Sequence, residues 1–543
     1  MVSSNRRIRM ETVALEQLPF LKGLSQEFNS VAEMFVARSS KIPDKPFVLY
    51  YDQVVTYAQT NERANRVAHY LKQEGVKKGD VVSIMVLNSP EVYYTMFGVQ
   101  KLGAVAGMVN FALKGPEIAY VLDNAKPKII FVSSEFMADF ALGFEAAAHK
   151  PIVVEVKTEA AHEIDLGQKQ LSDILSQHPA DEMLVAQQAS DPFMLLYSSG
   201  TTGRPKGILL SNQGQLSICR DMARIGLVEG DDVMLILLPM FHINPISVWT
   251  FPLIFCGQTL CVRKAFSPPD FWPAITENGV TILMGVPAMY NYVYYSIDAD
   301  TIDRANLKLK YAFCGAAPLS VELIKGFKEK YGVDIIEGYG LTEVTGVSTV
   351  NPPLGKRKPG SIGLPLLEQE VKIMDDDLNE LAAGERGEIC IKGQANMLSY
   401  LNNPEATAET LKDGWLRTGD IAYMDEQGYS YIVDRKKDMI NRGGENIYPG
   451  EIEIALDAHP DIVASAVIGV PDEALGERVK AIIEISKPGV LTEQDVKDYL
   501  SDRLAKYKIP EFVEITEKIP RNPTGKILKR ILRQMELDKG ARG

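Results

Sequence analysis

Short runs of β-branched residues alternate with longer amphipathic stretches through the first half of the chain. Residues 81–86 form one such run, residues 90–102 have helical periodicity, and residues 129–132 form the next run. The runs at 128–132 and 152–156 are mainly apolar and are bounded by Lys, Pro or Ser, which is typical of strands buried on both faces. The pattern predicts an α/β fold in which helices cover a parallel sheet.

The rhythm changes between Asp375 and Tyr431, where short strand-like runs are separated by closely spaced glycines. Glycine supports the tight turns that join short strands, so this region is expected to form a small twisted β-layer. The layer is expected to lie at the edge of the first domain.

A smaller α/β unit is expected after the charged string at residues 434–438. Residues 451–458 and 494–506 are predicted to be helical, and residues 463–469 are predicted to be extended. A length of 543 residues is also too great for a single hydrophobic core. We therefore expect two domains, residues 1–434 and residues 435–543.

Composition and charge narrow the classes of function. The chain is 46% hydrophobic and 24% charged, which is typical of a globular protein. Its formal net charge of −13 disfavours general binding to nucleic acid or to anionic lipid, because both repel an acidic surface. A local basic pocket remains compatible with this charge.

The uncharged run at residues 233–262 is long enough to span a bilayer. However, Pro239, Pro245 and Pro252 each interrupt a helical ladder, and His242 and Asn244 add polar groups. We expect a buried strand, a loop and a core helix here, with no integral membrane segment.

The cysteine pattern favours a reducing compartment. There are five cysteines and no CxxC spacing, so neither a disulfide framework nor a zinc cluster is indicated. The arginines near the start are not followed by an apolar run of signal-peptide length, because Glu11 and Glu16 interrupt it. A cytoplasmic location is expected, with a mitochondrial transit peptide as the less favoured alternative.

A loop dense in glycine, hydroxyls and two cations follows an apolar run within residues 195–207. Glycine lets backbone N–H groups approach an anion, and Arg204 and Lys206 neutralise charge, so a triphosphate is the expected ligand. An ordinary surface loop is the alternative. The motif is not a Walker A loop, because Gly207 rather than Ser or Thr follows Lys206. The candidate contacts are Ser198, Ser199, Gly200, Thr201, Thr202, Gly203 and Lys206.

Five further motifs follow this loop along the chain. They are Glu337-Gly338-Tyr339-Gly340-Leu341-Thr342-Glu343, Thr418-Gly419-Asp420, Asp434-Arg435, residues 443–449 and Pro523-Thr524-Gly525-Lys526. In order and separation they resemble the adenylate-forming superfamily, which includes acyl-CoA synthetases, carrier-protein adenylation domains and firefly-type luciferases. The overall pattern is most similar to the acyl-CoA synthetases, from about Ser30 to Arg530. The resemblance implies a large domain of α/β subdomains with a small β-subdomain, followed by a small mobile α+β domain.

The second motif is suited to the adenine and phosphate ends of ATP. Tyr339 offers an aromatic face between two flexible glycines, Gly338 and Gly340, and Glu337 precedes them. A hard oxygen ligand beside a triphosphate suits magnesium, so Glu343 is the candidate Mg²⁺ ligand and Thr342 the candidate phosphate contact. For a lone Glu, an exposed acid at a helix end would be the default interpretation.

Ribose and pocket contacts are expected at two further places. Asp420 is predicted to end a short strand, where its carboxylate can accept both ribose hydroxyls, and Arg435 can brace the ribose or a phosphate. A surface salt bridge is the alternative for either residue. Small residues at Gly315, Ala316 and Ala317 permit close backbone approach, and the resemblance implies that they line the adenine and acyl pocket.

The resemblance implies two residues that act on the carboxylate. Lys526, on a turn before a predicted basic helix at residues 527–533, would be the catalytic lysine of adenylation. His242 would contact the substrate carboxylate, although a lone histidine on an apolar segment is more often a core residue. The attacking carboxylate is already an anion, so no general base is required.

The resemblance further implies that the small domain rotates between two half-reactions. The hinge would be Lys437, two positions after the ribose-binding arginine. Gly443 and Gly444 would form the wall along which the pantetheine arm of coenzyme A reaches the adenylate, and Glu445 belongs to the same segment.

Together these features predict an AMP-forming acyl-CoA synthetase that uses ATP, Mg²⁺ and coenzyme A. An enzyme that loads a carrier protein, an enzyme that oxidises its adenylate to emit light, and a non-catalytic nucleotide sensor are the alternatives. The apolar and aromatic pocket segments predict a monocarboxylic acid with an apolar tail or ring. The sequence does not decide the chain length of this acid, and it leaves a homodimer open.

Overall fold

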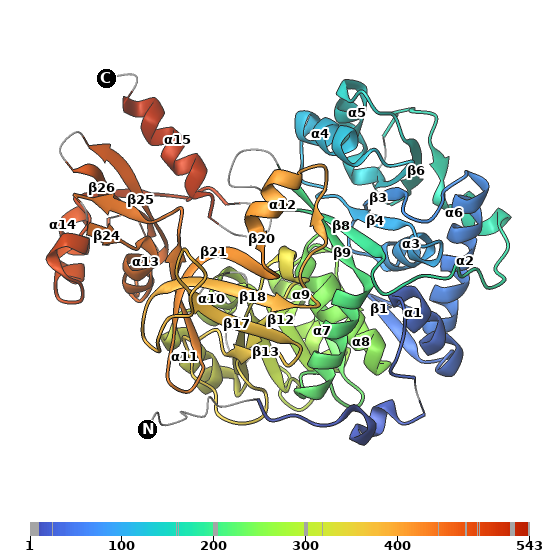
Figure 1. The fold of residues 1–543 in the computed structure, drawn as a ribbon, viewed down its shortest axis with the longest axis horizontal. Helices are drawn as coiled ribbons and strands as arrows, with labels where there is room; N and C mark the ends of the chain where they lie inside the picture. Colours follow the sequence, from blue (N-terminus) through green and yellow to red (C-terminus); the bar gives the residue numbers. More distant parts are fainter. Residues whose placement is uncertain are drawn as a thin grey trace.

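The structure is a computed structural model that describes residues 10–540, apart from residues 24, 159, 161, 199–204, 298–301, 316, 318, 444, 473–474, 486, 488 and 522–526. This part of the chain forms two large sheets, a small β-subdomain and a C-terminal unit, and the two large sheets exchange strands along the sequence (Figure 1). The predicted α/β fold class is therefore confirmed. Within the described ranges, no helix is long and apolar enough to cross a membrane.

The first large sheet is covered by helices on both faces. Its spatial order is β19 (Ser399–Tyr400), β9 (Lys206–Ser211), β8 (Pro192–Ser198), β4 (Val105–Met108), β3 (Val81–Met85), β5 (Ile129–Ser133), β6 (Ile152–Val156) and β7 (Lys169–Gln170), with helices α2 (Tyr57–Gln73), α3 (Pro90–Lys101), α4 (Gly115–Ala125), α5 (Met137–Ala146) and α6 (Leu171–Gln177). In β5, Ile129 and Phe131 enter the core that contains α2 and α3, whereas Ile130 and Val132 enter the core beneath α4 and α5. The pairing of β3, β4, β5 and β6 is parallel, as predicted.

The second large sheet shares the main core with the first. Its order is β16 (Leu364–Pro365), β15 (Thr349–Val350), β14 (Asp334–Tyr339), β13 (Tyr311–Cys314), β12 (Ile282–Gly285), β10 (Val233–Ile236), β11 (Thr259–Val262), β1 (Pro46–Tyr50) and β2 (Gln53–Thr56). Helices α1 (Val31–Lys41), α7 (Asn212–Arg224) and α8 (Phe251–Cys256) belong to this shared core, and α9 (Pro268–Glu277), α10 (Pro287–Ser296) and α11 (Val321–Tyr331) cover the other face. Short 3₁₀ turns lie at Leu15–Gln17, Pro19–Leu21 and Ser134–Phe136.

The uncharged run at residues 233–262 folds as β10, a π-helix at Asn244–Thr250, α8 and β11. Pro252 has no N–H with which to bond the Ser247 carbonyl oxygen five residues earlier. That oxygen accepts a hydrogen bond from Nε2 of Gln215 at 2.8 Å instead. The expected strand, loop and core helix are therefore confirmed, with a π-helix within the intervening segment.

A β-subdomain separates the two large sheets from the C-terminal unit. It contains β17 (Gln369–Met374), β18 (Gly387–Gly393), β20 (Leu411–Lys412), β21 (Trp415–Met424) and β22 (Ser430–Arg435), and α12 (Pro404–Thr410) precedes β20. These strands pair in antiparallel fashion, and their range includes most of the predicted β-layer.

The C-terminal unit has its own hydrophobic core. It contains β23 (Ile440–Arg442), β24 (Glu445–Ile447), β25 (Ile462–Asp472), β26 (Gly476–Ile485), β27 (Phe512–Thr516), α13 (Pro449–Asp457), α14 (Glu493–Ser501) and α15 (Lys529–Gly540). Two predicted boundaries are wrong. The helix predicted to end at Lys506 ends at Ser501, where Arg503 and Leu504 both donate to the Leu500 carbonyl, and a 3₁₀ turn follows at Lys506–Lys508. The helix predicted from Ile527 begins at Lys529, because Ile527 pairs with Arg521 in a β-bridge.

Asp221 makes the free energy of unfolding depend on pH. It is fully buried on α7, where its Oδ2 accepts a hydrogen bond from the Glu368 N–H at 3.0 Å, and burial raises its pKa from 3.8 to about 7. The folded protein therefore holds this proton where the unfolded chain has lost it, so stability falls as the pH rises toward 7. We expect Asp221→Asn to stabilise the protein more at pH 8 than at pH 5, by on the order of 2 kcal/mol. Urea denaturation at both pH values measures this difference, and equal effects would assign the change to packing.

Candidate active site

The hairpin of β8 and β9 carries the predicted phosphate loop. The two strands are antiparallel, and Ser198 lies opposite Lys206, so the two ends of the loop are held side by side. Ser198 and Lys206 are thus brought together. The other predicted phosphate contacts lie outside the described residues: Ser199, Gly200, Thr201, Thr202 and Gly203.

Lys206, Tyr400 and Glu343 form a chain of contacts beside this loop. The Nζ atom of Lys206 lies 4.7 Å from the centre of the Tyr400 ring, and the Tyr400 hydroxyl donates to Oε1 of Glu343 at 2.9 Å. Glu343 lies in the 3₁₀ turn Thr342–Val344, which follows β14 closely. Burial raises the pKa of Glu343, and the Tyr400 hydrogen bond and the charges of Arg435 and Lys206 oppose this rise. Lys206 and Glu343 therefore meet at Tyr400 from separate segments, and the charge of Arg435 acts on Glu343 from a third.

The donor set at Glu343 fits magnesium. In the part of the chain that the structure describes, no group of three or more His, Cys, Asp or Glu residues could hold a metal ion. Magnesium commonly binds one or two carboxylates together with substrate phosphates and keeps several waters. A single carboxylate next to the phosphate loop is therefore sufficient for a magnesium ion that arrives with a triphosphate.

Asp420 is held by two side chains from different elements. The Tyr339 hydroxyl donates to Oδ2 at 2.6 Å, and Nε of Arg435 lies 3.1 Å from Oδ1. Asp420 and Arg435 are register partners on β21 and β22. The prediction that Asp420 ends a short strand is wrong: it lies inside β21, because a register shift with Gly419 at φ +73° lets the strand continue. The structure brings the two residues together in an ion pair, and their contact with ribose stays a prediction.

The glycines around Tyr339 are required for close packing. A Cβ at Gly338 would lie 2.4 Å from Cζ of Phe313, and a Cβ at Gly340 would lie 2.2 Å from the Gly346 carbonyl oxygen. Neither glycine has a positive φ, so the flexibility expected of them is not what the fold uses. Oε2 of the preceding Glu337 accepts a hydrogen bond from the Gly360 N–H at 2.8 Å, and burial raises the pKa of Glu337 to about 7.

The predicted acyl side of the site has a neutral histidine. Burial lowers the pKa of His242 to about 4, and its buried Nε2 has no hydrogen-bond partner among the described residues. Such an atom is suited to a polar atom of a bound molecule. A Cβ at Gly315 would lie 3.4 Å from the Gly338 carbonyl oxygen and 3.8 Å from Nδ2 of Asn244, so the turn after β13 touches both β14 and the π-helix. Ala317 is exposed, and Ala316 lies outside the described residues.

Of the C-terminal candidates, Lys437, Gly443 and Glu445 lie in the described part of the chain. Lys437 is exposed in the turn between β22 and β23, and Gly443 adopts φ +60° with its N–H donating to the Leu475 carbonyl. Glu445 is exposed at the start of β24. Among the described residues, no hydrogen bond or ion pair joins these three to Lys206 or Glu343. Gly444 and Lys526 lie outside the described residues.

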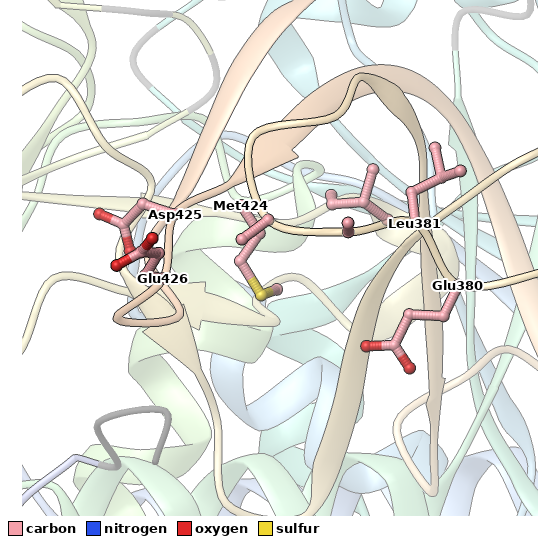
Figure 2. A pocket seen from close by; sticks show the side chains of 8 residues that line it. Glu380, Leu381, Met424, Asp425 and Glu426 are labelled. Atoms are coloured by element: carbon pink, nitrogen blue, oxygen red, sulfur yellow. The ribbon is translucent and has the colours of Figure 1, made fainter. Parts of the chain in front are cut away.

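A hollow in the β-subdomain is a poor candidate for the substrate site. Figure 2 shows Glu380, Asp425 and Glu426 around it, together with Leu381 and Met424. Asp425 and Glu380 already pair with Lys358 and Lys372, so the hollow offers an anion no uncommitted cation among its lining residues. None of the predicted site residues lines this hollow.

Solved structures place this arrangement of subdomains in the class of adenylate-forming enzymes. The anthranilate CoA ligase AuaEII, solved with anthranoyl-AMP, is 28% identical with a TM-score of 0.87, covering 97% of this chain and 100% of that chain. ATP-bound MatB from Rhodopseudomonas palustris is 30% identical with a TM-score of 0.84, covering 94% of this chain and 99% of that chain.

The chain belongs to the family of AMP-binding enzymes. The AMP-binding enzyme family matches residues 35–401, and the AMP-binding enzyme C-terminal domain matches residues 451–526. The long-chain-fatty-acid–CoA ligase FadD13 of Mycobacterium tuberculosis H37Rv is 36% identical, covering 89% of this chain and 93% of that protein. Feruloyl-CoA synthase of Amycolatopsis sp is 32% identical, covering 91% and 96%. The prediction of an ATP-dependent acid–thiol ligase is therefore confirmed at the level of the class.

Proposed function

We propose that this enzyme joins a carboxylic acid to ATP to form an acyl-adenylate and pyrophosphate, and then transfers the acyl group to coenzyme A with release of AMP. The observation that carries the proposal is the meeting of Lys206 and Glu343 at Tyr400, beside the strand that leaves the phosphate loop, with the charge of Arg435 acting on the same carboxylate. Opposite charges gathered from separate segments are what a triphosphate with a divalent cation requires.

Adenylation needs positioning and charge neutralisation from the protein. The substrate carboxylate is the nucleophile and is already ionised, so the enzyme has to align it with the α-phosphorus. Lys206 and Thr342 contact phosphate oxygens, Asp420 accepts the ribose hydroxyls, and Lys526 stabilises the charge that develops as pyrophosphate leaves. Glu343 would hold Mg²⁺, which neutralises phosphate charge when it is bound. In its neutral form, the His242 imidazole can donate a hydrogen bond to a carboxylate oxygen of the substrate.

Thioester formation uses the C-terminal unit differently. We propose the boundary at residues 434 and 435, with Lys437 as the hinge and with Gly443, Gly444 and Glu445 as the wall for the pantetheine arm. A separate hydrophobic core in the C-terminal unit supports its movement as a body. The proposed substrate is a monocarboxylate with an apolar tail or ring. The proposed location is cytoplasmic, and the five free, buried cysteines support it.

Exchange of labelled pyrophosphate into ATP tests the first half-reaction. Purified protein with Mg²⁺ should catalyse exchange only in the presence of an accepted acid, offered as a series of short, medium, long and aromatic acids. Thioester formation with coenzyme A, compared with a holo carrier protein, tests the second half-reaction. Absence of exchange with every acid in the series would reject the proposal.

The hinge is tested by Lys437→Pro. Asp438 N–H donates to the Arg435 carbonyl at 2.9 Å, so Lys437 is the third residue of a four-residue turn. Proline fixes φ near −65° and restricts the residue before it, so the variant has fewer backbone states available for rotation. We expect thioester formation to fall by about tenfold or more while pyrophosphate exchange changes by less than about threefold. Single-turnover measurements of each half-reaction provide the comparison, and equal losses would remove Lys437 as the hinge.

A further inference from the structure

Tyr400 connects the phosphate loop to the metal-binding turn. It lies on β19, which pairs in antiparallel fashion with β9, and Tyr400 is opposite Ile208 in that pair. Lys206 is two residues before Ile208, on the same face of β9. Diagonal neighbours across an antiparallel pair lie within reach of aromatic side chains, which accounts for the position of the Lys206 ammonium over the ring.

The segment around Tyr400 is also attached to the turn that bears Glu343. The Met397 N–H donates to the Glu343 carbonyl at 2.7 Å, and the Thr345 hydroxyl donates to the Ala395 carbonyl at 2.6 Å. The Leu401 N–H donates to the Gly207 carbonyl at 2.7 Å. The backbone on either side of Tyr400 therefore contacts Glu343 and Gly207, the residue that follows Lys206, and only 7% of the Tyr400 surface is exposed.

The aromatic ring lies between two opposite charges. No ion pair joins the described side chains of Lys206 and Glu343, although each contacts Tyr400. In a partly buried site, a lysine and a glutamate that could meet would pair with each other and neutralise both charges. A tyrosine between them satisfies one carboxylate oxygen and the ammonium while leaving both charges available to a ligand.

We propose that Tyr400 is a positioning residue of the phosphate and metal site: its ring places the Lys206 ammonium and its hydroxyl orients the Glu343 carboxylate. This inference rests on the proposed function, because that function assigns Lys206 to phosphate and Glu343 to magnesium. The two contacts act on different ligands, so they are separable by substitution. The ring supports the binding of ATP through Lys206, and the hydroxyl supports the binding of Mg²⁺ through Glu343.

Binding measurements with two variants separate the contacts. Tyr400→Phe keeps the ring under Lys206 and removes the hydroxyl, whereas Tyr400→Leu removes both. The affinity for ATP is measured by calorimetry with and without Mg²⁺, so the readout does not depend on turnover. We expect Tyr400→Phe to bind ATP without Mg²⁺ as the wild type does. The factor by which Mg²⁺ increases the affinity for ATP should be about tenfold smaller than in the wild type, as for other groups that orient a metal ligand. Tyr400→Leu should also weaken metal-free ATP binding by about threefold.

Tyr70→Phe is a matched control. Tyr70 also has a lysine above its ring, with Nζ of Lys169 at 5.0 Å, but it lies on α2 and its buried hydroxyl has no hydrogen-bond partner among the described residues. This variant should bind ATP as the wild type does, with and without Mg²⁺.

Each outcome decides part of the proposal. An unchanged Mg²⁺ effect in Tyr400→Phe would overturn the role of the hydroxyl, and equal metal-free affinities in Tyr400→Leu and Tyr400→Phe would overturn the role of the ring. Failure of pyrophosphate exchange in a wild-type protein whose Mg²⁺ effect depends on Tyr400 would reject the proposed reaction while leaving this role intact. A wild type that binds no ATP would reject both.

Discussion

Replacing Lys526 with alanine is expected to reduce acyl-adenylate formation by about 100-fold or more, because one preorganised charge at a developing anion contributes about 3 kcal/mol. Thioester formation from supplied acyl-adenylate should change little, since that step needs no charge at departing pyrophosphate. Single-turnover assays of the two half-reactions measure this division. Similar losses in both would assign Lys526 to folding or to general nucleotide binding.

The described residues on either side of Lys526 are bonded within the C-terminal unit. Arg521 and Ile527 form an antiparallel bridge, and the Leu528 N–H donates to the Pro520 carbonyl at 2.9 Å. Nη1 of Arg521 lies 2.8 Å from Oε2 of Glu484. Arg521 and Ile527 are therefore both attached to the C-terminal unit. Lys518→Ala is a suitable control, because Lys518 is an exposed lysine a short distance before this segment and should tolerate the change without effect on either half-reaction.

The alternation of apolar runs and helical stretches is sufficient to predict the parallel, helix-covered strands β3, β4, β5 and β6. Ile129 to Val132 alternate between two cores, and such a run has to be apolar at every position. Parallel strands buried on both faces therefore leave a clear pattern in the sequence. The ends of helices leave a weaker pattern in the sequence. Helix α15 begins later than predicted because Ile527 forms a β-bridge with Arg521, which lies outside the helix.

The contacts of the site depend on pairing between distant segments. Tyr339 and Asp420 are 81 residues apart, and Tyr400 and Glu343 are 57 apart, so no local pattern links the members of either pair. The motifs identified Tyr339, Asp420 and Glu343, whereas Tyr400 lies outside the motifs considered and was missed. Its position follows from the pairing of β19 with β9, the strand that leaves the phosphate loop, and that pairing has no local signal in the sequence.

The role of a residue is also harder to predict from the sequence than its position. Gly338 and Gly340 were expected to give flexibility around an aromatic face, yet both have ordinary φ values and are needed because a ring and a carbonyl lie against them. This depends on Phe313 and Gly346, which belong to other elements. Packing of this kind is decided by tertiary structure, and the sequence provides only the glycines.

Asp420→Ala is expected to weaken ATP binding by about 100-fold, since a carboxylate that accepts ribose hydroxyls makes charge-assisted hydrogen bonds of about 1.5 to 3 kcal/mol each. The same variant should lower the free energy of unfolding by about 2 kcal/mol, because the Tyr339 hydroxyl loses its acceptor. Calorimetry with ATP and urea denaturation measure the two effects.

Asp420→Asn separates binding of the ribose from support of Tyr339. The amide oxygen can still accept the Tyr339 hydrogen bond but the amide nitrogen then faces Arg435, so the free energy of unfolding should fall less than in Asp420→Ala, while the affinity for ATP falls by about tenfold with the loss of charge. The wild type should discriminate against 2′-deoxy-ATP and 3′-deoxy-ATP, and the variant should discriminate less, because the hydroxyls lose an ionised acceptor. If the wild type and Asp420→Asn distinguish these nucleotides equally, Asp420 supports Tyr339 and Arg435 without touching the ribose.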